Sequence, residues 1–379
     1  MKISGICCIT YLASSLLLAA SPAAVQAPSS RAVAIRESLA AIEAECQRAA
    51  GGDWQKWNDA LSPFREEMLR RIKALRPYNP AATGSFESRS AVLESLSDPP
   101  LFEADPQNYL VHILDGANLR EWLPSRTAIL AMNSISNWLR LKGIEFLVVP
   151  VPKLTEVYPD LMATGTPADR IVSPPTRLLV NELLRQDVET IDLLPMYLAA
   201  RRKSPSLLYS PVDTHWRQEA QIMATLEIGR RLRRNQFFNA AKAKPPIFDE
   251  RSQSMYWRGT FYEALNPRQR ERVESFLTMP LVEVSPKPGY ALTKVDAPVV
   301  MIGDSFAGGL LPLLARELNV PINDLSSAGQ TTQAVKDFLR DPSLLAPAKA
   351  VVLFVSMRTL AVAEWQTPPP ILKLAKPIR

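Results

Sequence analysis

Two short segments of this 379-residue sequence carry the residue types that acyl chemistry needs. The segment "PVDTHW" contains one of only two histidines, His215, two residues after Asp213. The segment "VVMIGDSFAGG" (299–309) places Ser305 directly after an apolar run. A serine hydroxyl becomes a good nucleophile when a base takes its proton, and an aspartate that orients the base completes the set. Asp213, His215 and Ser305 therefore predict nucleophilic catalysis through an acyl-enzyme.

Each segment taken alone also fits an ordinary structural role. Asp213 or Thr214 suits the cap of the helix that follows, with His215 merely polar. Gly-Asp-Ser suits a strand-to-helix turn in which Asp304 or Ser305 is the cap. The two segments are stronger together, because we expect a strand before each of them, over 207–210 and 297–304. Both would then lie at the carboxyl edge of a sheet, where α/β folds bind ligands.

The surrounding sequence alternates between helical and extended patterns. Apolar residues at three- and four-residue spacing predict helices over 123–143, 175–187, 216–234, 309–319 and 332–341. Short apolar runs predict strands over 144–152, 188–194, 297–304, 320–326 and 350–356. This alternation predicts an α/β fold, a mostly parallel sheet with helices on both faces. Residues 236–290 have no clear period and are interpreted as an insertion.

The N-terminal third of the sequence divides into segments by composition. Residues 1–27 have the layout of a secretory signal, with Lys2 as the only charge and a small-x-small site at its end. An uncleaved membrane anchor is the alternative, because the apolar run approaches the length of a spanning helix. Helical spacing and then a Pro- and Ser-rich linker occupy 28–106. The remaining residues, 107–379, form the predicted main domain.

Composition excludes several functional classes. The formal charge of +6 is a mild positive excess, which weakly favours an anionic polymer as the binding partner. The run "RRLRR" (230–234) reads as a solvated helix end, so we expect no nucleic-acid partner. Beyond residue 27 only Cys46 remains, which excludes an intrachain disulfide there. Two histidines and one cysteine make a zinc site of the usual spacing untenable, and no cofactor motif is present. His112 lies among apolar residues and is interpreted as a packing or partner-bonded histidine rather than a base.

These residues resemble a known family. "GDSF" and Asp-x-His resemble the SGNH hydrolase superfamily, but Asp213 and His215 precede Ser305 here by about ninety residues. That order is similar to the alginate O-acetyltransferase family of AlgJ and AlgX, whose SGNH-like domains are circularly permuted. The likeness covers about residues 120–360. It implies an SGNH-hydrolase-like sheet in circularly permuted order, preceded by a helical N-terminal segment.

The resemblance implies roles for further residues. Ser305 would be the nucleophile, His215 the base and Asp213 its orienter. "VVPVPKLTEVYP" (148–159) resembles the family's Pro-x-Lys…Tyr-Pro segment, which makes Lys153 and Tyr158 candidate substrate contacts. The structural alternatives are a lysine stem covering apolar surface and a tyrosine at a turn.

The same family resemblance draws attention to Arg358 and to the groups that could stabilise an oxyanion. Arg358 follows the last predicted strand and is a candidate to position substrate, with a structural ion pair as the alternative. The asparagine that SGNH proteins place after a core strand is missing, since Ser356 and Met357 follow "LFV". The backbone amides of Ser305 and Gly329 are the candidate oxyanion donors.

The resemblance implies an exported O-acetyltransferase that works in the periplasm, either cleaved from residues 1–27 or held by them at the inner membrane. Its acceptor would be an exopolysaccharide, alginate-like or cellulose-like. A membrane-bound acyltransferase would supply acetyl, and no cofactor is expected. The same triad would serve a carbohydrate acetylesterase. A non-catalytic polysaccharide-binding scaffold of a secretion complex is the alternative from another class.

Overall fold

The computed structural model describes most of the chain from Ser30 to Trp365. The described residues are 30–64, 126–162, 167, 170–204, 207–210, 213, 215–259, 262, 267–327, 330–362 and 365. The expected signal segment, most of the expected linker and His112 lie outside them. Within these ranges, no helix has both the length and the apolar character that a membrane span requires.

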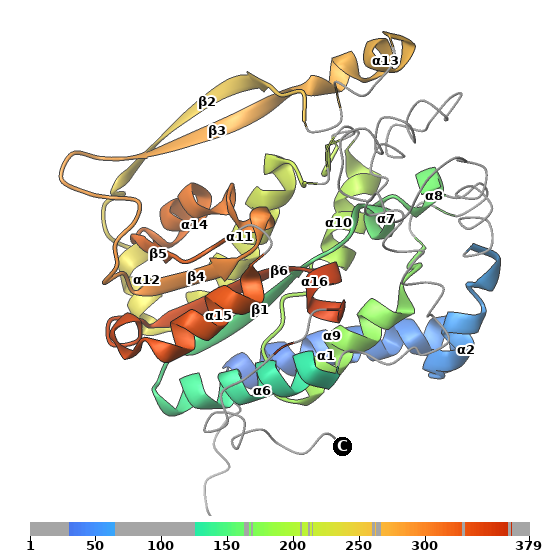
Figure 1. Ribbon diagram of the computed structural model, residues 1–379, viewed down its shortest axis with the longest axis horizontal. Coiled ribbons are helices and arrows are strands. Elements are labelled where there is room, and N and C mark those ends of the chain that lie inside the picture. The colour runs from blue at the N-terminus through green and yellow to red at the C-terminus, as the bar shows by residue number, and fades with distance from the viewer. Residues whose placement is uncertain are drawn as a thin grey trace, which may run out of the picture.

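A four-stranded parallel sheet lies at the centre of the molecule, in the order β1-β6-β4-β5 (Figure 1). Its strands are β1 (Glu145–Val151), β6 (Ala350–Ser356), β4 (Val299–Gly303) and β5 (Ile322–Asp324). Every residue of β4 and β6 is buried, because helices cover both faces of the sheet. The predicted α/β class, with a parallel sheet between two helical layers, is confirmed.

Alternate residues of each strand feed two hydrophobic cores, one on each face of the sheet. Val299 and Met301 of β4 pack with α10 (Leu194–Lys203), α11 (Gln218–Leu232) and α14 (Leu310–Leu318). Val300 and Ile302 pack with the helices of the other layer. These are α1 (Ser30–Ala50), α6 (Arg126–Leu141), α9 (Pro174–Arg185), α15 (Thr331–Arg340) and α16 (Met357–Val362). Strand periodicity of two therefore sets the layered architecture.

The N-terminal helices pack directly on the sheet's helical layer. Helix α1 and the short α2 (Trp54–Asp59) both contact α9. Arg177 of α9 is 2% exposed and forms ion pairs with Glu45 at 2.6 Å and Asp192 at 2.7 Å. A buried guanidinium needs such partners, so Arg177 ties α1 to the loop before α10.

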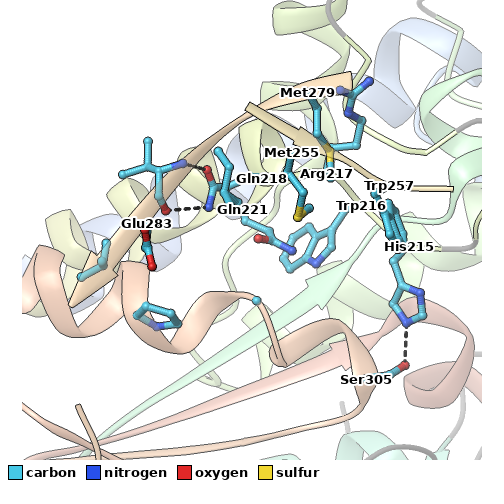
Figure 2. Close-up of a pocket in the computed structure, with 15 residues that line it drawn as sticks. His215, Trp216, Arg217, Gln218, Gln221, Met255, Trp257, Met279, Glu283 and Ser305 are labelled. Carbon is cyan, nitrogen blue, oxygen red and sulfur yellow. Dashed lines mark hydrogen bonds between the residues drawn. The ribbon is translucent and has the colours of Figure 1, made fainter. Parts of the chain in front are cut away.

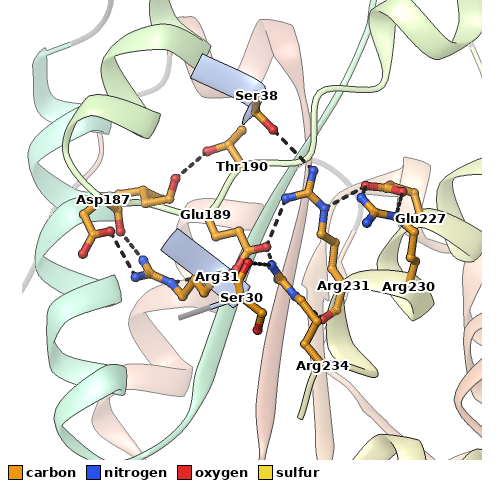
Figure 3. Close-up of polar contacts among 11 residues, drawn as sticks. Ser30, Arg31, Ser38, Asp187, Glu189, Thr190, Glu227, Arg230, Arg231 and Arg234 are labelled. Atoms are coloured by element: carbon orange, nitrogen blue, oxygen red, sulfur yellow. Dashed lines mark hydrogen bonds and ion pairs between the residues drawn. The ribbon is translucent and has the colours of Figure 1, made fainter. Parts of the chain in front are cut away.

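A second ion-pair cluster fixes the beginning of α1 (Figure 3). The fully buried carboxylate of Glu189 binds Arg234, and Arg231 lies 3.3 Å from the same oxygen. Arg31 lies 3.8 Å from the other oxygen of Glu189 and 3.1 Å from Asp187. We refer to Glu189 with these three arginines as the Glu189 cluster; it joins α1, α11 and the loop after α9.

An antiparallel ribbon projects from this body (Figure 1). It consists of β2 (Phe248–Tyr256) and β3 (Thr278–Pro286), and we call it the β2–β3 ribbon. Helix α12 (Gln236–Lys242) precedes the ribbon and α13 (Pro267–Leu277) lies at its far end. The region interpreted as an insertion thus has regular structure of its own. The remaining short helices are α7 (Leu154–Val157), α8 (Pro159–Met162), η3 (Ser305–Ala307) and η4 (Pro342–Leu344).

Three predicted strands are wrong or too long. Over 188–194 only Thr190 pairs with β1, and α10 begins at Leu194, because the proline after it favours the first turn of a helix. Over 207–210 only Tyr209 pairs, and its partner is Trp216 rather than the sheet. The strand predicted over 320–326 is limited to Ile322–Asp324. Asp213 therefore does not follow a strand of the sheet, contrary to the prediction.

Candidate active site

Ser305 lies where β4 turns into helix, as the sequence predicts. Strand β4 ends at Gly303, and Ser305 begins the 3-10 helix η3, which leads into α14. A Cβ at Gly303 would lie 2.6 Å from the Cβ of Ala307 and 2.9 Å from the carbonyl oxygen of Phe354. Only glycine leaves room for this approach between the turn and β6. Ser305 itself is exposed.

Asp304 is the residue that caps this turn. One carboxylate oxygen accepts a hydrogen bond from the backbone N–H of Phe306 at 3.0 Å. The other oxygen accepts from the backbone N–H of Ser356, at the end of β6, at 2.9 Å. Asp304 is only 6% exposed, so it joins the carboxyl ends of two strands. Because Asp304 performs the capping role, Ser305 is left free for chemistry.

Asp213, His215 and Ser305 form a continuous series of contacts. The Oδ1 atom of Asp213 lies 2.5 Å from Nδ1 of His215 and also accepts the backbone N–H of His215 at 3.0 Å. The Nε2 atom of His215 lies 2.9 Å from the Ser305 hydroxyl, as Figure 2 shows. The Asp213 side chain is 2% exposed, whereas that of His215 is 32% exposed. This geometry suits proton transfer from serine to an imidazole whose other nitrogen is held by a carboxylate.

The loop that contains Asp213 and His215, which we call the histidine loop, does not follow a strand of the sheet. Aromatic side chains hold it in place instead. The indole N–H of Trp216 donates to the carbonyl of Phe306 at 3.0 Å, which ties the loop to the serine turn. The ring of Phe306 lies 4.9 Å from that of His215 and 6.2 Å from that of Trp216, between centroids. Tyr209 pairs with Trp216 and donates its hydroxyl to the carbonyl of Pro152. The sequence signal for this role was the aromatic residue directly after His215.

Of the two candidate oxyanion donors, the structure describes Ser305 but not Gly329. The backbone N–H of Ser305 begins a helix, where the first N–H groups have no acceptor within the helix, so it stays a candidate. Gly329 lies outside the described residues. Ser356 occupies the position where the asparagine was missing, and its hydroxyl is 2.9 Å from that of Thr359.

The structure does not bring Tyr158 to the triad. Its side chain is 3% exposed, and its hydroxyl accepts the backbone N–H of Leu208 at 2.9 Å. The Arg201 guanidinium stacks on its ring at 4.4 Å, and burial raises the pKa of its hydroxyl. Tyr158 thus anchors the segment before the histidine loop.

Lys153 and Arg358 lie beyond the carboxyl ends of β1 and β6. Lys153 is half-buried and precedes α7, and its backbone N–H donates to Glu156 at 2.8 Å. Arg358 is the second residue of α16, and its side chain lies outside what the structure describes. Both positions are at the predicted edge of the sheet, and Lys153 does not line the cleft that contains Ser305.

That cleft has a volume of about 530 Å³ and lies between the β2–β3 ribbon and the first turns of α11 and α14 (Figure 2). Ser305 and His215 line one end of it. The side-chain amide of Gln218 donates to the carbonyl of Val282 at 3.0 Å and accepts the N–H of the same residue. Gln218 therefore fastens β3 to α11 beside the cleft, which Gln218 and Val282 both line. No group of three or more His, Cys, Asp or Glu side chains suited to a metal occurs among the residues described.

Comparisons with known proteins agree with the fold. A family model described as "SGNH hydrolase-like domain, acetyltransferase AlgX" matches residues 118–354. The chain is similar to the solved O-acetyltransferase domain of Pseudomonas putida AlgJ, with 16% identity over 68% of this chain and 92% of that one, and a TM-score of 0.52. Pseudomonas aeruginosa AlgX gives 16% identity, coverage of 66% and 60%, and a TM-score of 0.44. Bacillus cereus PatB1 has 14% identity over 64% of this chain and 92% of its own, with a TM-score of 0.42. The sequence matched no curated protein.

Proposed function

The chain belongs to the family of SGNH hydrolase-like acetyltransferase domains typified by AlgX, and from this premise we propose that it is an exported O-acetyltransferase acting on an exopolysaccharide. The observation that carries the proposal is the 2.9 Å contact between His215 and Ser305, with Asp213 behind the imidazole. Acyl transfer needs a nucleophile, a base and an orienting carboxylate, and these three side chains supply them.

In the first half-reaction, Ser305 accepts acetyl from a donor. The Ser305 oxygen attacks the donor's carbonyl carbon while His215 Nε2 takes the hydroxyl proton. Asp213 stabilises the imidazolium that forms. The Ser305 backbone N–H is the candidate donor of a hydrogen bond to the oxyanion. As the tetrahedral intermediate collapses, His215 returns the proton to the leaving group. Acetyl then remains as an ester on Ser305.

In the second half-reaction, a sugar hydroxyl takes the place of the leaving group. His215 accepts its proton as the sugar oxygen attacks the acetyl carbonyl, and Ser305 recovers its hydrogen when the ester bond breaks. Water can take the same route, and the exposure of Ser305 favours its access. A carbohydrate acetylesterase is therefore the second candidate, and occupancy by the acceptor decides between the two.

Location and partners are part of the proposal. The signal-like layout of residues 1–27 supports export to the periplasm, by cleavage or by retention as an inner-membrane anchor. The family resemblance supports a membrane-bound acyltransferase as the acetyl source and an exopolysaccharide as acceptor. Fractionation of cells that produce the full chain tests the location directly.

The decisive experiment separates transfer from hydrolysis. The purified protein is given p-nitrophenyl acetate with and without oligosaccharides, and acetylated sugar and free acetate are both quantified. We expect acetylated sugar with wild type, none with Ser305→Ala, and wild-type behaviour from Ser252→Ala, an exposed serine of β2. Acetate without acetylated sugar would indicate an esterase. No turnover at all, with His215→Ala equal to wild type, would indicate a scaffold.

A further inference from the structure

The cleft beside Ser305 is far larger than an acetyl group. Its volume of about 530 Å³ falls in the range of sites that enclose whole small molecules, ~300–1,000 Å³. Met255 and Met279 line it from the ribbon, and Trp257 lines it from the position directly after β2 (Figure 2). Pro312 of α14 also lines it. Trp257 is half-buried, so part of its surface is open to a ligand. This side of the cleft suits the apolar C–H face of a sugar ring, which packs on aromatic surfaces.

The first turn of α11 supplies polar groups to the same cleft. Arg217 is only 6% exposed, yet its Nε atom has no hydrogen-bond partner among the described residues. The Gln221 amide projects over Gly309, where a Cβ would lie within 2.6–2.9 Å of its atoms. A buried guanidinium N–H without a hydrogen bond is costly, and a ligand oxygen that accepted a hydrogen bond from it would remove that cost. These side chains suit the hydroxyl edge of a sugar.

The charges around the cleft offset one another. Arg217 lies 3.8 Å from Glu219, whose Oε2 atom also lacks a hydrogen-bond partner in the described part of the chain. Glu283 adds a further negative charge to the lining. Among the described lining residues, the positive charge of Arg217 is offset by Glu283, so a polyuronate would meet no surplus positive charge from them and its carboxylates would face Glu283. The described lining of the cleft therefore does not share the mild positive charge of the whole chain.

We propose that this cleft is the acceptor subsite and that it binds a neutral pyranose oligosaccharide, with Trp257 as the stacking platform and Arg217 and Gln221 as the hydroxyl-binding groups. The inference rests on the proposed function, because the bound sugar is the nucleophile for acetyl on Ser305. It narrows that function to an acceptor without carboxylates. The β2–β3 ribbon is then the element that selects the polymer.

Calorimetric titration of the purified protein tests this assignment. The probes are cellohexaose and maltohexaose as neutral chains and a mannuronate hexamer as the charged one. We expect at least one neutral hexaose to bind more tightly than the mannuronate, and Trp257→Ala to weaken that binding about tenfold. Arg217→Gln weakens it as well. Tyr290→Ala is the matched control, an exposed aromatic residue outside the cleft, and it leaves binding unchanged.

Three results would overturn the assignment. Tighter binding of the mannuronate, weakened by salt, would show an anionic subsite. Equal affinities of wild type and Trp257→Ala, or no binding of either neutral hexaose, would show that the ribbon does not hold the acceptor. Acetylation of Ser305 is measured separately by mass spectrometry. An adduct without sugar binding overturns the subsite alone, and sugar binding without an adduct overturns the proposed acyl-enzyme alone.

Discussion

Asp213 decides, at the scale of single residues, whether "DTHW" is a helix cap or part of a catalytic set. Its carboxylate contacts both the backbone N–H and the ring of His215, which itself contacts Ser305. A cap would bind backbone N–H groups of the helix, and in this structure Arg217, rather than Asp213, occupies the N-cap of α11. The same comparison assigns capping in "GDS" to Asp304. Both segments therefore favour the catalytic interpretation.

Asp213→Asn tests the orienting role. Asparagine keeps the size of the side chain but donates its amide hydrogens, so it no longer favours the histidine tautomer whose Nε2 can accept a proton. We expect turnover of p-nitrophenyl acetate to fall by about 10³-fold to 10⁴-fold, with an unchanged melting temperature. A loss smaller than tenfold would assign Asp213 to structure alone.

Gly303→Ala tests the close approach at the serine turn. The added Cβ would lie 2.6 Å from Ala307 and 2.9 Å from the Phe354 carbonyl, and neither group has room to move. We expect the free energy of unfolding to fall by about 1–3 kcal/mol in urea denaturation. Gly308→Ala is the matched control, since its nearest contact would be 3.6 Å, and it should unfold like wild type. Equal stability of the two variants would refute the packing argument.

Elements rather than residues explain which predictions succeeded. Short apolar runs predicted the sheet strands β1, β4 and β6, because these strands are buried on both faces. Apolar residues at three- and four-residue spacing predicted α1, α6, α9, α11, α14 and α15. Helix α10 was not predicted, because its first residue lay in the strand expected over 188–194. The β2–β3 ribbon was not predicted, because β2 is exposed over most of its length and shows no alternation of buried and exposed residues. The histidine loop was placed after a strand because "LLYS" is apolar, yet it pairs locally with Trp216. Long-range contacts of this kind leave no period in a sequence.

Gln218→Met tests the link between the ribbon and α11. Methionine fills a similar volume but removes both hydrogen bonds to Val282. Each such bond contributes about 1 kcal/mol, so amide exchange over 278–286 should accelerate by roughly tenfold or more. Gln253→Met is the control, because Gln253 is exposed on β2, outside the cleft lining. Unchanged exchange in Gln218→Met would show that the ribbon is held by other contacts.

The molecule as a whole combines a helical N-terminal segment and the sheet domain into one body. Helix α1 shares a hydrophobic core with α6 and α9, and the Glu189 cluster fixes its first residues (Figure 3). Sequence patterns predicted the helix but not this docking, because the arginines come from segments about two hundred residues apart. The two segments proposed to be catalytic in turn meet across 90 residues of chain. Whether their order arose by circular permutation stays a prediction.

Glu189→Gln tests the docking of α1. The substitution leaves three arginines around a buried site without their shared carboxylate, so we expect a loss of about 3 kcal/mol in the free energy of unfolding. Glu43→Gln provides the comparison, because its pair with Arg185 is about half exposed and worth at most about 1 kcal/mol. Calorimetric melting of both variants checks the difference. Equal melting temperatures would mean that the cluster contributes little to holding α1.

The central claim is that Ser305 becomes acetylated, and intact mass spectrometry with peptide mapping tests it most directly. The purified protein is mixed with p-nitrophenyl acetate, quenched within the first turnovers and digested. The account predicts a gain of about 42 Da on the peptide that contains Ser305, absent in Ser305→Ala and slow to form in Asp213→Asn. An adduct on another residue, or turnover that survives Ser305→Ala, would contradict it.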